Sequence, residues 1–148
     1  MSEFYIGMLM GLNGLIIVII EMVVIFHLES KNKTMLMIST GLLLTSLSFL
    51  VYIFLPLHPV TALISVILVT LGEIFAMPFM NNYWASRASQ HNRGQYAGYY
   101  TMAWSLAQVV GPTGGTWTAG HFGFNSLWWI MAVICLITGI LFRTLKLL

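Results

Sequence analysis

Five apolar runs, each long enough to cross a lipid bilayer, take up most of this 148-residue chain. They cover residues 4–28, 35–55, 60–82, 95–119 and 124–143. At about 1.5 Å of rise per residue, about 20 helical residues span the roughly 30 Å of hydrocarbon in a membrane. Lipid offers no hydrogen bonds to the backbone, so each run is predicted to be an α-helix. We therefore expect an all-α membrane protein of five transmembrane helices, with residues 1–148 forming a single membrane domain.

Charged residues are too scarce for a soluble domain. They make up 7% of the chain, whereas soluble proteins carry roughly 25%. The net charge of +2 is small and dispersed, which argues against a nucleic-acid partner and leaves membrane lipid as the expected surroundings. The four histidines and one cysteine lack the spacing of a metal site. No cofactor motif or catalytic constellation occurs, so we expect no cofactor and no enzyme.

The basic residues predict the orientation of the chain. Five crossings place the segments after the first, third and fifth runs on one side of the membrane. Every Lys and Arg lies in those segments: Lys31, Lys33, Arg87, Arg93, Arg143 and Lys146. The positive-inside rule makes that side cytoplasmic. We therefore expect a multi-pass protein of the cytoplasmic membrane, with its N-terminus outside and its C-terminus in the cytoplasm.

Two glutamates stand at mid-membrane depth, Glu21 in the first run and Glu73 in the third. A charge in lipid is costly, so such a residue usually faces a cavity or a partner. No Lys or Arg shares that depth, and each glutamate is therefore protonated or paired with a group outside these residues. We interpret both as candidates for proton coupling or solute contact. The alternative is a protonated carboxyl group that hydrogen-bonds to a neighbouring helix.

The fourth run carries two faces at helical spacing. Tyr100, Trp104 and Gln108 recur every fourth residue, and with Asn81 they are candidates to line a solute cavity. Simple aromatic packing is the alternative reading of this face. The other face is a stripe of small residues that would let a second helix approach closely. The stripe consists of Ala103, Ala107, Gly111, Gly115 and Ala119.

Pro112, between Gly111 and Gly114, is predicted to bend this helix because it removes a backbone hydrogen bond. A bent helix with only small side chains on one face is suited to moving against a neighbouring helix. The alternative interpretation of this face is close packing in a bundle that does not move. Polar residues at Asn13, Asn81 and Gln108 indicate that the first, third and fourth helices face a cavity or an interface. The second and fifth helices have only Ser and Thr inside them, which can bond their own backbone. We expect these two to be outer, lipid-facing supports.

Several motifs resemble the C-terminal half of a major facilitator superfamily transporter. They are Leu71-Gly72-Glu73 with Pro78, Arg93-Gly94 with Tyr96 and Gly98, and Gly111-Pro112-Thr113-Gly114-Gly115. Their order is similar to that in the tenth and eleventh helices of drug-antiporter-like and peptide-transporter-like members. The resemblance covers nearly the whole chain as helices eight to twelve, an incomplete C-terminal six-helix half. One departure is the segment HLESKNKT at residues 27–34, a degenerate version of a loop motif in the family.

The resemblance implies a secondary active, proton-coupled transporter of a small organic solute, with drug efflux favoured over solute or peptide uptake. It places Glu73 on a cavity-lining helix, where family members often have a gating or proton-coupling acid. Alternating access in this family needs two halves of the transporter that rock against each other, and one half cannot do this alone. We therefore expect the partner of this chain to be a missing N-terminal half. Two alternatives stay open: a small self-contained membrane protein that packs on a partner through the small-residue stripe, and a non-functional truncated remnant.

Overall fold

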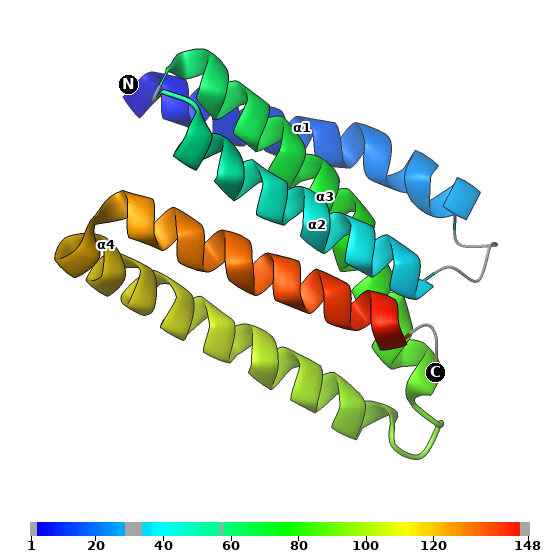
Figure 1. The fold of residues 1–148 in the computed structure, drawn as a ribbon. Helices are drawn as coiled ribbons and strands as arrows, with labels where there is room; N and C mark the ends of the chain where they lie inside the picture. Colours follow the sequence, from blue (N-terminus) through cyan, green and yellow to red (C-terminus); the bar gives the residue numbers. More distant parts are fainter. Residues whose placement is uncertain (1–2, 29–33, 57, 146–148) are drawn as a thin grey trace.

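The computed structural model describes residues 3–28, 34–56 and 58–145, and in this part of the chain it contains four α-helices. They are α1 (Glu3–Leu28), α2 (Thr34–Phe54), α3 (Pro59–Arg87) and α4 (Arg93–Leu145). All four are long and apolar enough to cross a membrane. Figure 1 shows them as a bundle with the helix axes running in roughly a common direction. Lys31, Lys33 and Lys146, which contribute to the predicted orientation, lie outside the described residues.

The helix count differs from the predicted five because the last two apolar runs lie in one element, α4. One residue inside α4 has non-helical backbone angles, Gly123, with φ 81° and ψ 163°. This conformation is essentially restricted to glycine. The ribbon doubles back there, and residues 124–145 return toward the end where α4 began (Figure 1). We call residues 93–122 the first arm of α4 and residues 124–145 its second arm. Helical turns continue up to Gly123 on both sides, so no separate connection remains between the two runs.

Pro112 does not mark the turn of the chain. It lies inside the first arm, whereas Gly123, the residue with non-helical angles, lies between the two arms. The hydroxyl groups of Thr113 and Thr116 donate to the carbonyl oxygens of Val109 and Pro112, at 2.7 and 2.8 Å. These bonds within one helix keep the threonine side chains satisfied around the proline.

The closest helix contact lies between α2 and α3, at two facing glycines. A Cβ atom added to Gly41 would stand 2.5 Å from the carbonyl oxygen of Gly72 and 2.7 Å from the backbone nitrogen of Ala76. A Cβ atom added to Gly72 would stand 2.8 Å from the carbonyl oxygen of Gly41. No real Cβ atom fits at such distances, so the two backbones touch because both side chains are absent.

Serine hydroxyl groups join α2 to the second arm of α4. Ser39 Oγ donates to the carbonyl oxygen of Gly139 at 2.7 Å, and Ser46 Oγ donates to that of Ala132 at 2.7 Å. All four residues are buried. These bonds join one face of each helix and do not show which helices face lipid, so the outer, lipid-facing position of the second and fifth apolar runs stays a prediction. The close approach of small residues lets serine reach a neighbouring helix as well as its own backbone.

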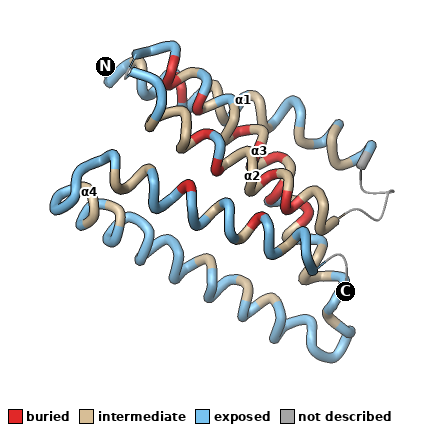
Figure 2. Tube along the Cα trace, in the orientation of Figure 1, coloured by how far each residue is buried: buried red, intermediate tan, exposed pale blue. Residues whose placement is uncertain are grey.

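Burial is uneven across the bundle. Figure 2 shows the buried residues mainly on α2 and α3, whereas the first arm of α4 is exposed almost throughout. α1 packs on α3 and contributes a single buried residue, Leu9, among its described side chains. The fold thus consists of a packed centre of α2, α3 and the second arm, with two exposed helical segments beside it.

Candidate functional site

The structure brings Glu73 against an amide group of α1. Glu73 lies in the middle of α3 and is half-buried. Asn13 Nδ2 donates to Glu73 Oε2 at 3.1 Å and to Thr70 Oγ1 at 3.0 Å. Thr70 precedes Glu73 by three residues, which puts both on one face of α3. We call this group the Asn13–Thr70–Glu73 cluster.

The hydrogen atoms of this cluster can be assigned. The Thr70 hydroxyl group donates its only hydrogen to the carbonyl oxygen of Val66 at 2.6 Å, so toward Asn13 it can only accept. Asn13 therefore uses both amide hydrogens, one on Thr70 and one on Glu73. Glu73 Oε2 accepts, a role open to a carboxylate and to the carbonyl oxygen of a carboxylic acid. The hydrogen bond from Asn13 is thus compatible with either form of the Glu73 side chain.

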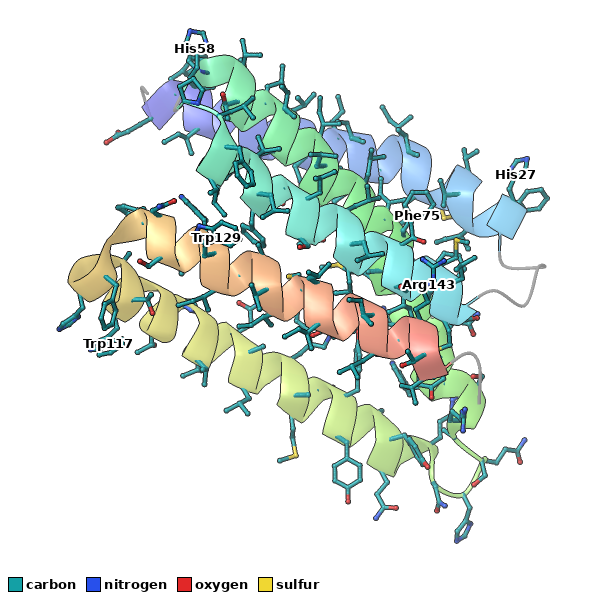
Figure 3. The ribbon with its side chains drawn as sticks, in the orientation of Figure 1. His27, His58, Phe75, Trp117, Trp129 and Arg143 are labelled. Atoms are coloured by element: carbon teal, nitrogen blue, oxygen red, sulfur yellow. The ribbon has the colours of Figure 1, made fainter. Side chains whose placement is uncertain are left out.

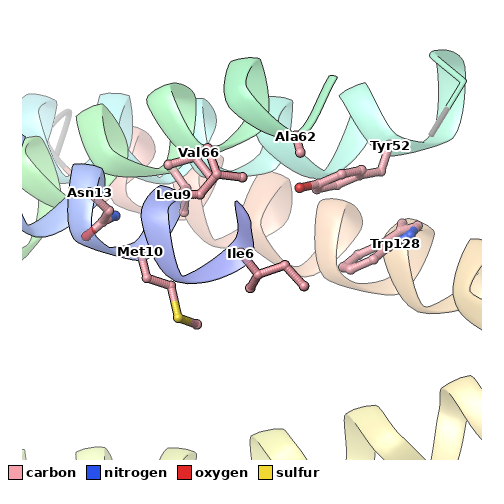
Figure 4. Close-up of a pocket in the computed structure, with 9 residues that line it drawn as sticks. Ile6, Leu9, Met10, Asn13, Tyr52, Ala62, Val66 and Trp128 are labelled. Carbon is pink, nitrogen blue, oxygen red and sulfur yellow. The ribbon is translucent and has the colours of Figure 1, made fainter. Parts of the chain in front are cut away.

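An apolar pocket of about 530 Å³ opens beside the cluster, and Asn13 forms part of its wall (Figure 4). Tyr52 and Trp128 form an aromatic wall, with their rings stacked at a centroid distance of 5.0 Å. The pocket is lined by Ile6, Leu9, Met10, Asn13, Tyr52, Ala62, Val66, Val69 and Trp128. Ligand pockets typically measure roughly 300–1,000 Å³ and are mostly apolar with a few polar groups. The pocket is therefore of a size and character to hold a small organic molecule.

Glu21 does not join this site. It lies on α1 two helical turns beyond Asn13 and is half-buried. It makes no hydrogen bond or ion pair with any residue that the structure describes. The two glutamates therefore stand in different surroundings, although the sequence gives them the same depth.

The other predicted cavity residues gather where the end of α3 meets the first arm of α4. Tyr100 stacks on Trp84 with ring centroids 5.7 Å apart and meets Trp104 edge-on at 6.4 Å. Trp84 Nε1 donates to Asn81 Oδ1 at 3.4 Å. A groove of about 310 Å³ lies here, lined by Met80, Tyr100, Ala103, Trp104 and Ala107. Asn81, Tyr100 and Trp104 thus come together, two turns of α3 away from Glu73.

The remaining residues singled out on the fourth run lie apart from both hollows. Gln108 is exposed and lines neither of them. A Cβ atom added to Gly94, Gly111 or Gly114 would meet nothing within 4 Å, and one added to Gly115 would meet only Leu127, at 3.9 Å. Within the described chain, no helix packs closely on the small-residue stripe at Gly111.

The described cations lie at one end of the bundle. Arg87 ends α3, and Arg93 and Arg143 lie near the two ends of α4, all of which are close to the label C in Figure 1. Figure 3 shows Arg143 at the same end as His27 and far from His58 and Trp117. The Arg87 guanidinium group lies over the Tyr83 ring, 5.2 Å from its centroid. The arginine side chains of the described residues are therefore concentrated at one end of the helix bundle.

Sequence reasoning named Asn13 and Glu73 but did not pair them, and it missed Thr70 and the apolar pocket. The available signal was the Thr70–Glu73 spacing of three residues, which marks a polar face in an apolar run.

In the described part of the chain, no three His, Cys, Asp or Glu side chains form a group that could hold a metal ion.

Comparison with known protein families gives a match. The model of the Major Facilitator Superfamily matches residues 1–147. No curated protein and no solved structure matches the chain. Both the Asn13–Thr70–Glu73 cluster and the groove lined by Tyr100 and Trp104 lie within the matched residues.

Proposed function

We propose that this chain, which belongs to the major facilitator superfamily, is part of a proton-coupled secondary transporter in which Glu73 binds and releases the proton. The family supports membrane transport as the function and a transporter rather than an enzyme. The observation that carries the proposal is the half-buried Glu73, held by Asn13 at 3.1 Å, within an apolar span. Intramembrane carboxyl groups with a polar partner are typical of proton relays in transporters.

The walls of the apolar pocket favour a lipophilic solute, as in drug efflux. Among the described residues, no charged side chain lines the pocket, and Tyr52 and Trp128 present aromatic faces to it. A peptide carries charged termini that would need charged partners there. We therefore propose a solute that is largely apolar and aromatic, exported by antiport with protons.

The proposed arrangement has five crossings, with the turn at Gly123 separating the last two. The end of the bundle that carries Arg87, Arg93 and Arg143 is then cytoplasmic. The exposed apolar sides of α1 and of the first arm, which include Met10, Val18 and Leu106, are covered by the other half of the transporter. Alternating access rocks one such half against the other around a midplane site.

Proton-driven accumulation of a lipophilic dye tests this proposal. Inside-out membrane vesicles that contain the complete transporter are loaded with an acidic interior, and the uptake of an uncharged aromatic dye is followed by fluorescence. We expect uptake well above that of vesicles without the transporter, and we expect a protonophore to abolish it. Uptake that persists after the protonophore removes the gradient would argue against proton coupling. Proton-driven uptake of short peptides, with no dye uptake, would argue for the peptide-transporter reading.

A second proposed function is that of a helix-packing partner, favoured by the open surroundings of Gly111 in the small-residue stripe. An added Cβ atom at Gly111 meets nothing within 4 Å, and one at Gly115 meets only Leu127 at 3.9 Å, so another helix could approach the stripe there. We expect replacement of Gly111 and Gly115 by leucine to break such an association, because small residues are what permits close helix contact. Crosslinking in native membranes measures this, and an unchanged crosslinking pattern would count against the partner role.

A further inference from the structure

We infer that Asn13 is a positioning residue for Glu73, which makes α1 part of the proton-binding site. The inference rests on the proposed function of Glu73. It concerns a residue on a different helix, sixty positions away in the sequence.

The geometry gives Asn13 a fixed orientation. Thr70 is fully buried and accepts one of the two amide hydrogens at 3.0 Å. The second amide hydrogen then points to Glu73 Oε2, at 3.1 Å. Thr70 therefore orients the amide group, and the amide group orients the carboxyl group of Glu73. Because Thr70 already holds the amide group of Asn13 in place, Asn13 loses little conformational freedom when it donates to the Glu73 carboxyl group.

Charged groups on the neighbouring helices do not supply the same interaction. α2 has no charged residue in its sequence. The charged or titratable residues of α1 are Glu3, Glu21 and His27, apart from its tyrosine. Those of α4 include Arg93, His121 and Arg143. In the described part of the chain, neither these groups nor the tyrosines of the three helices bond to Glu73, whose described partner is Asn13. Among the described residues, the amide group of Asn13 is thus the one that holds the Glu73 carboxyl group.

Asn13 also connects the acid to the apolar pocket. It lines the pocket of about 530 Å³ while it donates to Glu73. A solute that occupies the pocket therefore touches the same side chain that holds the acid. Asn13 is in this way placed to transmit solute binding to proton binding.

The rate of carbodiimide labelling tests the inference. Dicyclohexylcarbodiimide modifies membrane carboxyl groups in the protonated form, and mass spectrometry quantifies the label at each glutamate. The protein in its native membrane vesicles is labelled over a range of pH. In Asn13→Leu, we expect the rate of Glu73 labelling at each pH to rise roughly three- to tenfold, because the carboxyl group loses the hydrogen bond that holds it in place. In Asn13→Gln, which keeps the amide donor, we expect the wild-type profile.

Glu21 is the internal control, since it lies on the same helix as Asn13 without contact to it. Its labelling profile should not change in either variant. An unchanged Glu73 profile in Asn13→Leu overturns the inference while it leaves the proposed function standing. An equal rise at Glu21 also overturns it, because the effect would then be general to the helix. If wild-type Glu73 takes no label at any pH, the proposed function fails together with the inference.

Discussion

Replacing Gly41 by alanine is expected to lower the free energy of unfolding of the bundle by about 3 kcal/mol, the upper part of the usual range for overpacking. The added methyl carbon would stand 2.5 Å from one backbone atom of α3, 2.7 Å from another and 2.8 Å from the Cβ atom of Ala76. Backbone atoms cannot rotate away as a flexible side chain can, so α2 and α3 must separate. Detergent-induced unfolding followed by circular dichroism measures the change.

Gly111→Ala is the matched control for this experiment. It makes the same chemical change inside a helix, but the added carbon meets nothing within 4 Å. We expect stability to stay the same or to rise by roughly 0.5 kcal/mol, because alanine restricts the unfolded chain more than glycine does. Equal losses of stability in the two variants would show that loss of glycine itself matters, and the α2–α3 contact would not be the cause.

Glu73→Gln is expected to abolish proton-driven transport and to leave the fold intact. Glutamine has nearly the same volume, and its carbonyl oxygen can accept the hydrogen that Asn13 now donates at 3.1 Å. It cannot bind and release a proton, so a proton gradient no longer drives the solute. Uptake driven by an imposed gradient should fall to the level of vesicles without the transporter. Exchange of labelled for unlabelled solute, which needs no net proton movement, should continue.

Glu21→Gln is the control for that variant. Glu21 shares the carboxyl chemistry of Glu73 but lies two helical turns beyond Asn13 on α1 and makes no bond to any described residue. We expect gradient-driven uptake to stay near that of the unchanged protein. A wild-type pH dependence in Glu73→Gln would contradict the role of Glu73. Loss of uptake in Glu21→Gln instead would move that role to α1.

The helical fold was largely predictable because the apolar runs are long and charge is rare. The contacts between helices were not. The sequence drew attention to the stripe from Ala103 to Ala119, yet the tight contact lies at Gly41 and Gly72. Each of these glycines starts a short small-xxx-small pattern, with Thr45 and Ala76 respectively. Such patterns recur throughout apolar helices, and only the three-dimensional arrangement selects the pair that meets.

The candidate site was predictable residue by residue but not as a group. Glu73 stands out because a carboxyl group in the apolar part of a membrane is energetically costly and is therefore usually functional. Its partner Asn13 lies on another helix, and helical periodicity relates residues within one helix only. The same limit explains why Asn81, Tyr100 and Trp104 shared a prediction with Glu73 although the structure separates them into a second group.

The serine bonds between α2 and the second arm have a consequence for how the protein is made. Ser39 and its partner Gly139 are separated by 100 residues, and Ser46 and Ala132 by 86. A ribosome adds about 5–20 residues per second, so α2 emerges some 5 to 20 seconds before the helix that it bonds. During that interval its hydroxyl groups must turn to their own backbone or to the insertion machinery. Assembly of the packed centre therefore waits for the second arm of α4, and a ribosome that stops before residue 132 leaves α2 without these interhelical partners.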